Sequence, residues 1–347
     1  MRLPRPRGLL SSRLLSVLSG PVRRDGGLHD AAATAVQEAG TVLSDDDVQL
    51  GLVLLQELSH DGLDAVDDSW ERSADVVDAR AVLEDAVEAE LRDEVAPAVQ
   101  RWLPPARLDL SETLFELTDA AEGPSLAGHL QRQATRPQLD EFLVQRSLLQ
   151  LREADAHTWL IPRLTGRPKA ALVEVQSDEY GGGRLEAMHQ QLYANTLREA
   201  GLDPEYGSYL DRLPATTLAG STTARMFGQQ RRLRGAAAGH LAAVEATSSL
   251  PNRRFAAAVR RLGLGDRAAA YFDEHVVADA AHEQVVVRDL CGGLVEQEPA
   301  LLEDVLFGAA SCLLFDGRMA TAVLDAWAAG ESSLLPAEPQ QRLGAAS

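Results

Sequence analysis

The sequence has few cysteines, no long apolar run and too little positive charge to balance its acids. Two cysteines, Cys291 and Cys312, are too few for a disulfide framework, so we expect a reducing compartment and a cytoplasmic protein. The 33 basic and 52 acidic residues give a formal charge of −19, which argues against nucleic acid as a partner because its phosphates would be repelled. The longest apolar run, residues 305–315, is too short to span a bilayer, so we expect no membrane partner.

Several motifs that carry common chemistries are also missing. The chain has no G-x-x-x-x-G-K-[ST] phosphate loop, no G-x-S-x-G elbow and no C-x-x-C pair. Long alternating runs of β-branched residues are absent too, and the apolar residues recur instead at helical spacing between short segments marked by glycine and proline. The pattern therefore predicts an all-α protein, and 347 residues are enough for one large or two average domains.

Most of the negative charge is concentrated near the N-terminus. Residues 45–94 contain 17 acids and only three arginines, so they supply −14 of the −19. Apolar residues recur there every three or four positions, as at Leu50, Val53 and Leu54, which indicates amphipathic helices. Ser44 before three aspartates is typical of a helix start. We interpret the acids as the solvated face of two helices, with partner binding as a lesser alternative.

The composition divides the chain into four parts. Residues 1–43 begin with six arginines and no acid up to position 24, and we expect a flexible basic leader, although the start also resembles an export signal. Residues 44–120 form the acidic helical extension, residues 121–330 a helical bundle, and residues 331–347 a flexible tail rich in Pro, Ala and Gln. Within the bundle we expect helices at 124–133, 137–158, 169–200, 234–249, 253–262, 266–290 and 299–329.

Three ligand-type side chains share one face of the helix expected at 266–290. His275, Asp279 and His282 stand at i, i+4 and i+7, so they line up along that face. Two imidazoles and one carboxylate in that arrangement can bind iron, manganese or zinc and leave coordination positions open. The alternative is a surface helix that happens to carry polar residues. No catalytic residue is expected beyond such metal ligands.

A second candidate group surrounds three consecutive glycines at 181–183. Glu186-x-x-His189 has the spacing by which the helices of ferritin-like proteins present a carboxylate and an imidazole to metal. Glu179 is a rival carboxylate, but ten residues on an ideal helix place it about 80° away from the line of His189. The glycines permit a distortion that would remove this difference. Alternatively, they form a loop before a helix that begins near Arg184.

A third candidate, Glu245, lies on a strongly apolar, alanine-rich helix. A buried carboxylate needs a partner, which can be a metal ion or a structural salt bridge, and the residue alone does not distinguish them. His240 lies more than one turn before it.

Together these segments resemble a known family. Residues 178–189, Glu245, residues 252–254 and residues 271–283 resemble the iron-containing redox enzymes, which are haem-oxygenase-like di-iron oxidases and oxygenases. The resemblance extends over about 45–329 and implies a haem-oxygenase-like helical bundle with an N-terminal helical extension. It implies two Fe(II) ions held by six residues, with Glu179 favoured over Glu186: Glu179, His189, Glu245, His275, Asp279 and His282.

The resemblance also suggests residues around these ligands. Some relatives add a carboxylate from an upstream helix, and Glu153 occupies a suitable position, although it has no motif around it and could instead pair with Arg152 or His157. Glu186 stays a candidate neighbour of the ligands. Acids close to the ligands could accept hydrogen bonds from the imidazole N–H groups or simply be exposed to solvent: Asp178, Asp273, Glu274 and Glu283.

The function implied by the resemblance is oxidation by O2 of a small organic substrate. N-oxygenation, hydroxylation and oxidative C–C cleavage are all compatible with it, and an external reductant and a homodimer are possible partners. The metal identity comes from the resemblance, because the ligand types alone would equally admit manganese. The alternative function is a non-redox bundle of the same fold that stores metal or binds a partner.

Overall fold

The computed structural model describes residues 1–347 except 23–25, 104–108, 121–122 and 338–347, and also except the side chains of residues 279 and 280. In these described parts, all regular structure is helical, which confirms the all-α prediction. The α-helices are α1 Leu9–Leu18, α2 Gly27–Glu38, α3 Asp46–Glu57, α4 Ala74–Trp102, α5 Leu110–Asp119, α6 Leu126–Arg132, α7 Arg136–Gln150, α8 Asp155–Thr158, α9 Gly166–Glu179, α10 His189–Ala200, α11 Ala215–Gln229, α12 Arg234–Arg261, α13 Gly265–Gln284, α14 Gly293–Gln297 and α15 Leu302–Ala328. The short 3₁₀ segments are η1 Asp68–Arg72, η2 Ile161–Arg163, η3 Gly181–Gly183, η4 Leu185–Ala187, η5 Leu210–Arg212, η6 Arg231–Leu233 and η8 Pro299–Leu301, and η7 Val285–Gly292 is a π-helix.

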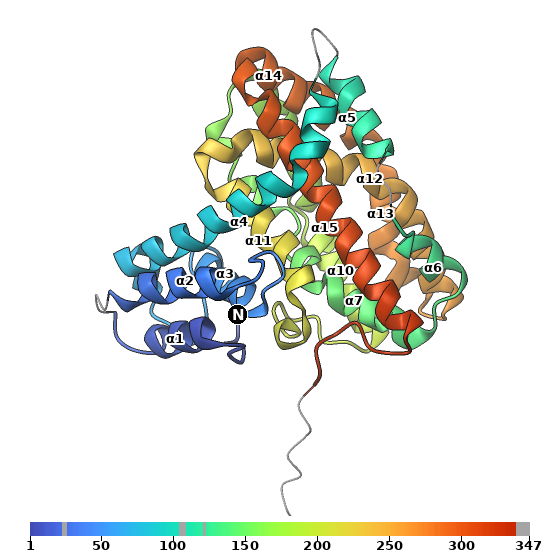
Figure 1. The fold of residues 1–347 in the computed structure, drawn as a ribbon. Coiled ribbons are helices and arrows are strands. Elements are labelled where there is room, and N and C mark those ends of the chain that lie inside the picture. Colours follow the sequence, from blue (N-terminus) through green and yellow to red (C-terminus); the bar gives the residue numbers. More distant parts are fainter. Residues whose placement is uncertain (23–25, 104–108, 121–122, 338–347) are drawn as a thin grey trace, which may run out of the picture.

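The long helix α12 is the centre of the bundle and packs against both α13 and α15 (Figure 1). Its crossing with α15 is so close that backbone touches backbone. A Cβ atom at Gly239 would lie 1.8 Å from the Val305 carbonyl oxygen, and one at Gly308 would lie 1.9 Å from the Ala236 carbonyl oxygen. Glycine is therefore required on both helices, and the contact fixes the position of the α12 face that carries Glu245.

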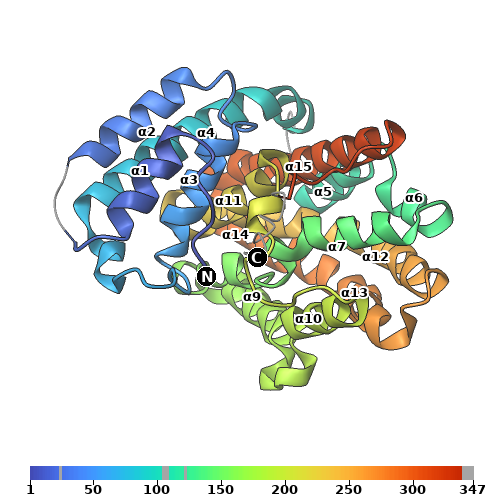
Figure 2. The same cartoon turned by 90° about the horizontal axis from the view of Figure 1, so that it is seen from below.

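The N-terminal residues 1–43, expected to be a flexible leader, contain two packed helices, α1 and α2 (Figure 2). Leu10, Leu14 and Leu18 form an i, i+4, i+8 stripe on α1, and all three are buried. The carboxylate of Asp47 on α3 accepts hydrogen bonds from the backbone N–H groups of Leu10 and Ser11 at 2.8 and 2.9 Å. The expectation was wrong because the arginines hid an apolar stripe that has a partner in α3.

The acidic segment is helical as predicted, but its acids are not all on a solvated face. Every residue of α3 from Val48 to Glu57 is buried, and Glu84 and Glu88 of α4 are buried as well. Glu57 lies 2.8 Å from the guanidinium of Arg225 on α11, which is also buried. The solvated-face interpretation is therefore wrong for these acids, because polar and basic partners from distant segments accompany them into the core.

Several of the expected helices differ in the structure. The helix expected at 137–158 is divided into α7, which ends at Gln150, and α8, which begins at Asp155. The helix expected at 169–200 is interrupted between Glu179 and His189, whereas the two expected between 234 and 262 are one continuous α12 that includes Pro251. The helix expected at 266–290 changes from α to π at Val285. A π segment within a helical run is frequent beside functional sites.

The C-terminal segment is partly fixed. Beyond α15, Leu335 donates its backbone N–H to the carbonyl of Arg212, and Gln145 donates to the carbonyl of Ser333. The expected flexible tail is therefore wrong for residues 331–337, and its remainder lies outside the described residues. No helix in the described ranges combines the length and the apolar character needed to cross a bilayer.

Candidate metal centre

Six of the seven expected ligands come together at the centre of the bundle. Glu179 ends α9, His189 begins α10, Glu245 lies on α12, and His275 and His282 lie on α13. These five residues are buried, with exposed fractions of 7% or less. Glu153 lies in the turn between α7 and α8, and its side chain is 16% exposed. The seventh expected ligand, Asp279, lies on α13, and its side chain is outside the described residues.

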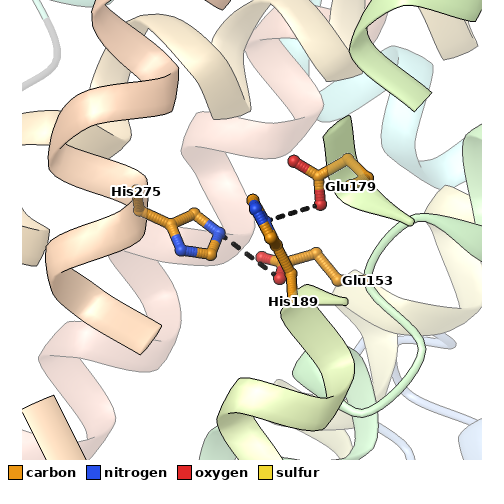
Figure 3. Close-up of side chains that lie close together, drawn as sticks. All are labelled: Glu153, Glu179, His189 and His275. Carbon is orange, nitrogen blue, oxygen red and sulfur yellow. Dashed lines mark ion pairs between the residues drawn. The ribbon is translucent and has the colours of Figure 1, made fainter. Parts of the chain in front are cut away.

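The first group of ligand atoms belongs to Glu153, Glu179, His189 and His275, and these atoms lie within 4.8 Å of one another (Figure 3). The Nδ1 atom of His189 is 3.0 Å from Oε2 of Glu179, and Nε2 of His275 is 3.4 Å from Oε2 of Glu153. The centres of the two imidazole rings are only 4.4 Å apart. Two carboxylates and two imidazoles thus face a common point.

The second group contains Glu179, Glu245 and His282, whose ligand atoms also lie within 4.8 Å of one another. The Nδ1 atom of His282 is 3.5 Å from Oε2 of Glu245, and its Nε2 atom is 3.1 Å from Oδ2 of Asp178. Glu179 belongs to both groups. A carboxylate with two oxygens can serve two neighbouring metal ions, so this geometry fits a pair of adjacent sites.

The three glycines decide between Glu179 and Glu186. Gly181, Gly182 and Gly183 all have positive φ, which ends α9 at Glu179 and turns the chain back. A Cβ atom at Gly181 would lie 2.6 Å from the backbone at Ala187 and Met188, so the loop is closed tightly. His189 is thereby placed at the start of α10 beside Glu179. Glu186 is exposed on the loop and is not part of either group.

Of the four acids expected to contact the ligand imidazoles, one does so in the structure. Asp178 contacts His282 as anticipated. Asp273 instead forms an ion pair with Arg260, and Glu274 is exposed. Glu283 accepts a hydrogen bond from the adjacent Gln284. Asp178 alone of these four acids therefore has a described contact with a candidate ligand.

Tyr271 supports the first group in a way that the sequence did not reveal. Its hydroxyl donates to the Glu153 carboxylate at 2.8 Å, and it accepts a hydrogen bond from Gln150 at 2.8 Å. Its carbonyl oxygen lies 2.8 Å from Nδ1 of His275, so that nitrogen carries the proton and Nε2 is left to face the group. The only signal in the sequence was the position of Tyr271 one helical turn before His275.

Interactions within the two groups raise the pKa values of two histidines and lower that of one glutamate. Burial alone would lower the pKa of His282, but Glu245, Asp178 and Glu179 raise it to about 9. The pKa of His189 is raised despite burial because of Glu179. Burial opposes ionisation of Glu153, but His275 and His189 lower its pKa. His189 and His282 are stabilised in their charged forms by the neighbouring carboxylates, as a divalent cation would be.

The donor atoms fit a divalent metal. Oε2 of Glu179, Nδ1 of His189 and Nδ1 of His282 are buried, and their contacts among the described residues are the ion pairs within the two groups, without a hydrogen bond of good geometry. An unsatisfied buried polar atom is costly, and coordination to a metal ion removes that cost. Imidazole and carboxylate donors suit iron, manganese and zinc. The residues present therefore fit an iron site.

A cavity of about 370 Å³ adjoins the ligands. Glu153, Glu179, Glu245 and His275 line one part of it, and residues of α7, α12 and α15 line much of the rest, together with residues of α6, α8, α9 and α11. This volume is within the range of small-molecule sites.

A family model described as iron-containing redox enzyme matches residues 140–317, which is half of the chain. The chain belongs to this family. The match begins in α7 and ends in α15, so it includes all seven expected ligands from Glu153 to His282, whereas α1–α6 precede it. No curated protein matches the chain. The fold is consistent with the haem-oxygenase-like all-α architecture, and the iron-containing redox enzyme inferred from the resemblance is confirmed at the level of the family.

Proposed function

We propose that this iron-containing redox enzyme is a non-haem di-iron oxidase or oxygenase, which uses O2 to oxidise a small organic substrate. The observation that carries the proposal is the sharing of Glu179 between two adjacent groups of ligand atoms. A single-metal site would not need the second group, in which Glu245 and His282 are buried on two different helices. Two adjacent sites favour chemistry that takes more than one electron from the metals.

The charge of the ligands supports two divalent ions. The full set expected from the sequence contains four carboxylates, from Glu153, Glu179, Glu245 and Asp279. Their four negative charges balance two Fe(II) ions, so the loaded site would carry no large uncompensated charge within the protein. When bound, the two ferrous ions would supply the electrons that reduce O2.

The protein's own part is to hold the ligands and to limit the access of water. Tyr271 holds the Glu153 carboxylate, its carbonyl orients His275, and Asp178 orients His282. The adjoining cavity leaves room for the substrate beside the ligands rather than at the protein surface. Hydroxylation, N-oxygenation and oxidative C–C cleavage all suit this arrangement, and repeated turnover by an oxygenase would require an external reductant.

Anaerobic loading with Fe(II) followed by exposure to O2 tests the proposal. We expect about two irons per chain by elemental analysis, and O2 uptake with a transient change in visible absorption. Glu245→Ala and His282→Ala should each lower the iron content and abolish the O2-dependent change, whereas the exposed Glu186→Ala should leave both unaltered.

The negative outcomes are separable. Stoichiometric iron that is unaffected by Glu245→Ala and His282→Ala would refute the assignment of the site. A fully loaded protein that does not react with O2 would favour metal storage on the same fold. Preferential retention of Mn(II) over Fe(II) under matched loading would contradict the proposed metal.

A further inference from the structure

The cavity beside the ligands is lined by a positively charged side chain, Arg146, that has no role in the proposed chemistry. Arg146 lies on α7 and lines the cavity together with Phe142 and Leu149 of the same helix. Gln150 follows Arg146 by one turn on α7, and Glu153 lies in the turn after the helix, so one wall of the cavity contains both Arg146 and a candidate ligand.

Burial opposes the charge of Arg146, but Asp316 and Glu153 raise its pKa, and of these two acids only Asp316 accepts a hydrogen bond from it among the described residues. Its one ion pair described in the structure is to Asp316 of α15, at 3.4 Å between Nη1 and Oδ1, and the Asp316 side chain is 54% exposed. The Arg146 side chain is only 25% exposed. A guanidinium has five N–H donors and is always charged, so a single long contact to a solvated acid leaves most of its hydrogen-bonding capacity for another anion.

The amide side chains in the same wall also have unused polar atoms. Oε1 of Gln150 and Nε2 of Gln176 are buried and have no hydrogen-bond partner among the described residues. Both glutamines line the cavity and are at least nine-tenths buried. Much of the remaining wall is apolar and includes Phe142, Leu149 and Val244. The cavity thus combines apolar walls with the Arg146 cation and several of the candidate ligands.

We propose that the substrate is a small organic carboxylate whose carboxylate group pairs with Arg146, while the atom to be oxidised lies beside Glu153 and Glu179 in the same cavity. This inference rests on the proposed function for the oxidation, but the binding of the carboxylate does not depend on it. The planar fork of Arg146 matches a carboxylate through two parallel hydrogen bonds.

The orientation has a consequence for the reaction. On this proposal the carboxylate is held by Arg146 and not by the candidate metal ligands, so the carboxyl carbon is not the reacting atom. The substrate is instead oxidised several bonds away and keeps its carboxylate. Arg254, which also lines the cavity and donates to Ser125, adds a second positive charge that favours entry of an anion.

Calorimetric titration of the anaerobic Fe(II)-loaded protein tests the inference. The probes are hexanoate, octanoate and phenylpropionate, each compared with the primary amide and the amine that have the same carbon skeleton. At least one carboxylate should bind about 10- to 100-fold more tightly than its amide and amine, as expected for a hydrogen bond between charged groups. Octyl phosphate distinguishes a carboxylate site from a general anion site and should bind less tightly than octanoate.

Arg146→Gln should remove this preference, and Arg146→Lys should restore part of it, because lysine keeps the charge without the fork. Arg136→Gln removes the same charge from α7 at a position that does not line the cavity, so it should leave the preference unchanged. Melting temperatures and iron content within the wild-type range show that the variants are folded and loaded.

Two results would overturn the inference. The first is equal binding of carboxylate, amide and amine for all three skeletons. The second is a carboxylate preference that survives Arg146→Gln but disappears when iron is removed, because the carboxylate would then bind the metals directly. Failure of the proposed function is distinguishable, since iron-free protein should still show the Arg146-dependent preference.

Discussion

Replacing Glu179 by glutamine should weaken metal binding at both sites, whereas replacing any other candidate ligand of the two groups should weaken binding at one site. Glu179 contributes a ligand atom to each group, at 3.0 Å from His189 in the first. Glutamine keeps the size of the side chain, which is 7% exposed, but removes its charge and reduces its ability to ligate. The change thus tests ligation rather than packing.

The expected magnitude follows from a comparison with Asp178. Its carboxylate contacts Nε2 of His282 at 3.1 Å and acts through that ligand, and loss of such outer contacts costs 10- to 100-fold in metal affinity. A direct ligand should cost more. Glu179→Gln should therefore weaken binding by more than about 100-fold, or about 2.7 kcal/mol, at both sites. Asp178→Asn should weaken one site and by less.

Competition with a chelator under anaerobic conditions measures the two affinities, and elemental analysis gives the iron per chain. Glu186→Gln is the matched control, because it makes the same chemical change on the neighbouring loop at an exposed position. The reasoning is refuted if Glu179→Gln retains two irons with affinities within tenfold of the unsubstituted protein, or if it loses only one.

Three further changes test the framework around the site. Gly239→Ala should lower the free energy of unfolding by at least about 2 kcal/mol in urea titration, because its Cβ would lie 1.8 Å from a backbone oxygen of α15; an unchanged midpoint would contradict the close crossing. Burial lowers the pKa of His157 to about 3 and that of His240 to about 4, so the unfolded chain binds more protons than the folded protein below pH 6.5. The free energy of unfolding should therefore fall by up to about 1.4 kcal/mol per histidine and pH unit from pH 6.5 towards 4. His240→Gln should reduce this pH dependence, as measured by urea titrations at pH 5 and 7. Tyr271→Phe removes a hydrogen bond to a ligand carboxylate and should weaken iron binding about tenfold in the chelator assay without lowering the iron content at saturation; unchanged affinity would exclude this support.

The sequence predicted those features of the site that depend on local geometry. His275 and His282 had to share a helical face because seven residues make nearly two turns. The choice of Glu179 over Glu186 did not follow from ideal-helix geometry, and the resemblance supplied it. The structure gives the physical reason: three glycines with positive φ end α9 and place Glu179 beside His189.

Features that depend on tertiary packing were not predictable in the same way. Leu10, Leu14 and Leu18 looked like part of a leader because their partner, α3, is a separate segment. Glu57 looked solvated because Arg225, which neutralises it, is 168 residues away in the chain. The support of Glu153 by Tyr271 likewise joins residues 118 positions apart. Neither charge patterning nor periodicity encodes such pairs.

Anomalous diffraction at the iron edge, from crystals loaded anaerobically with Fe(II), tests the central claim most directly. Two peaks are predicted: one among Glu153, Glu179, His189 and His275, and one among Glu179, Glu245 and His282, with Glu179 contacting both. A single peak, or iron bound without Glu179, would contradict the shared site.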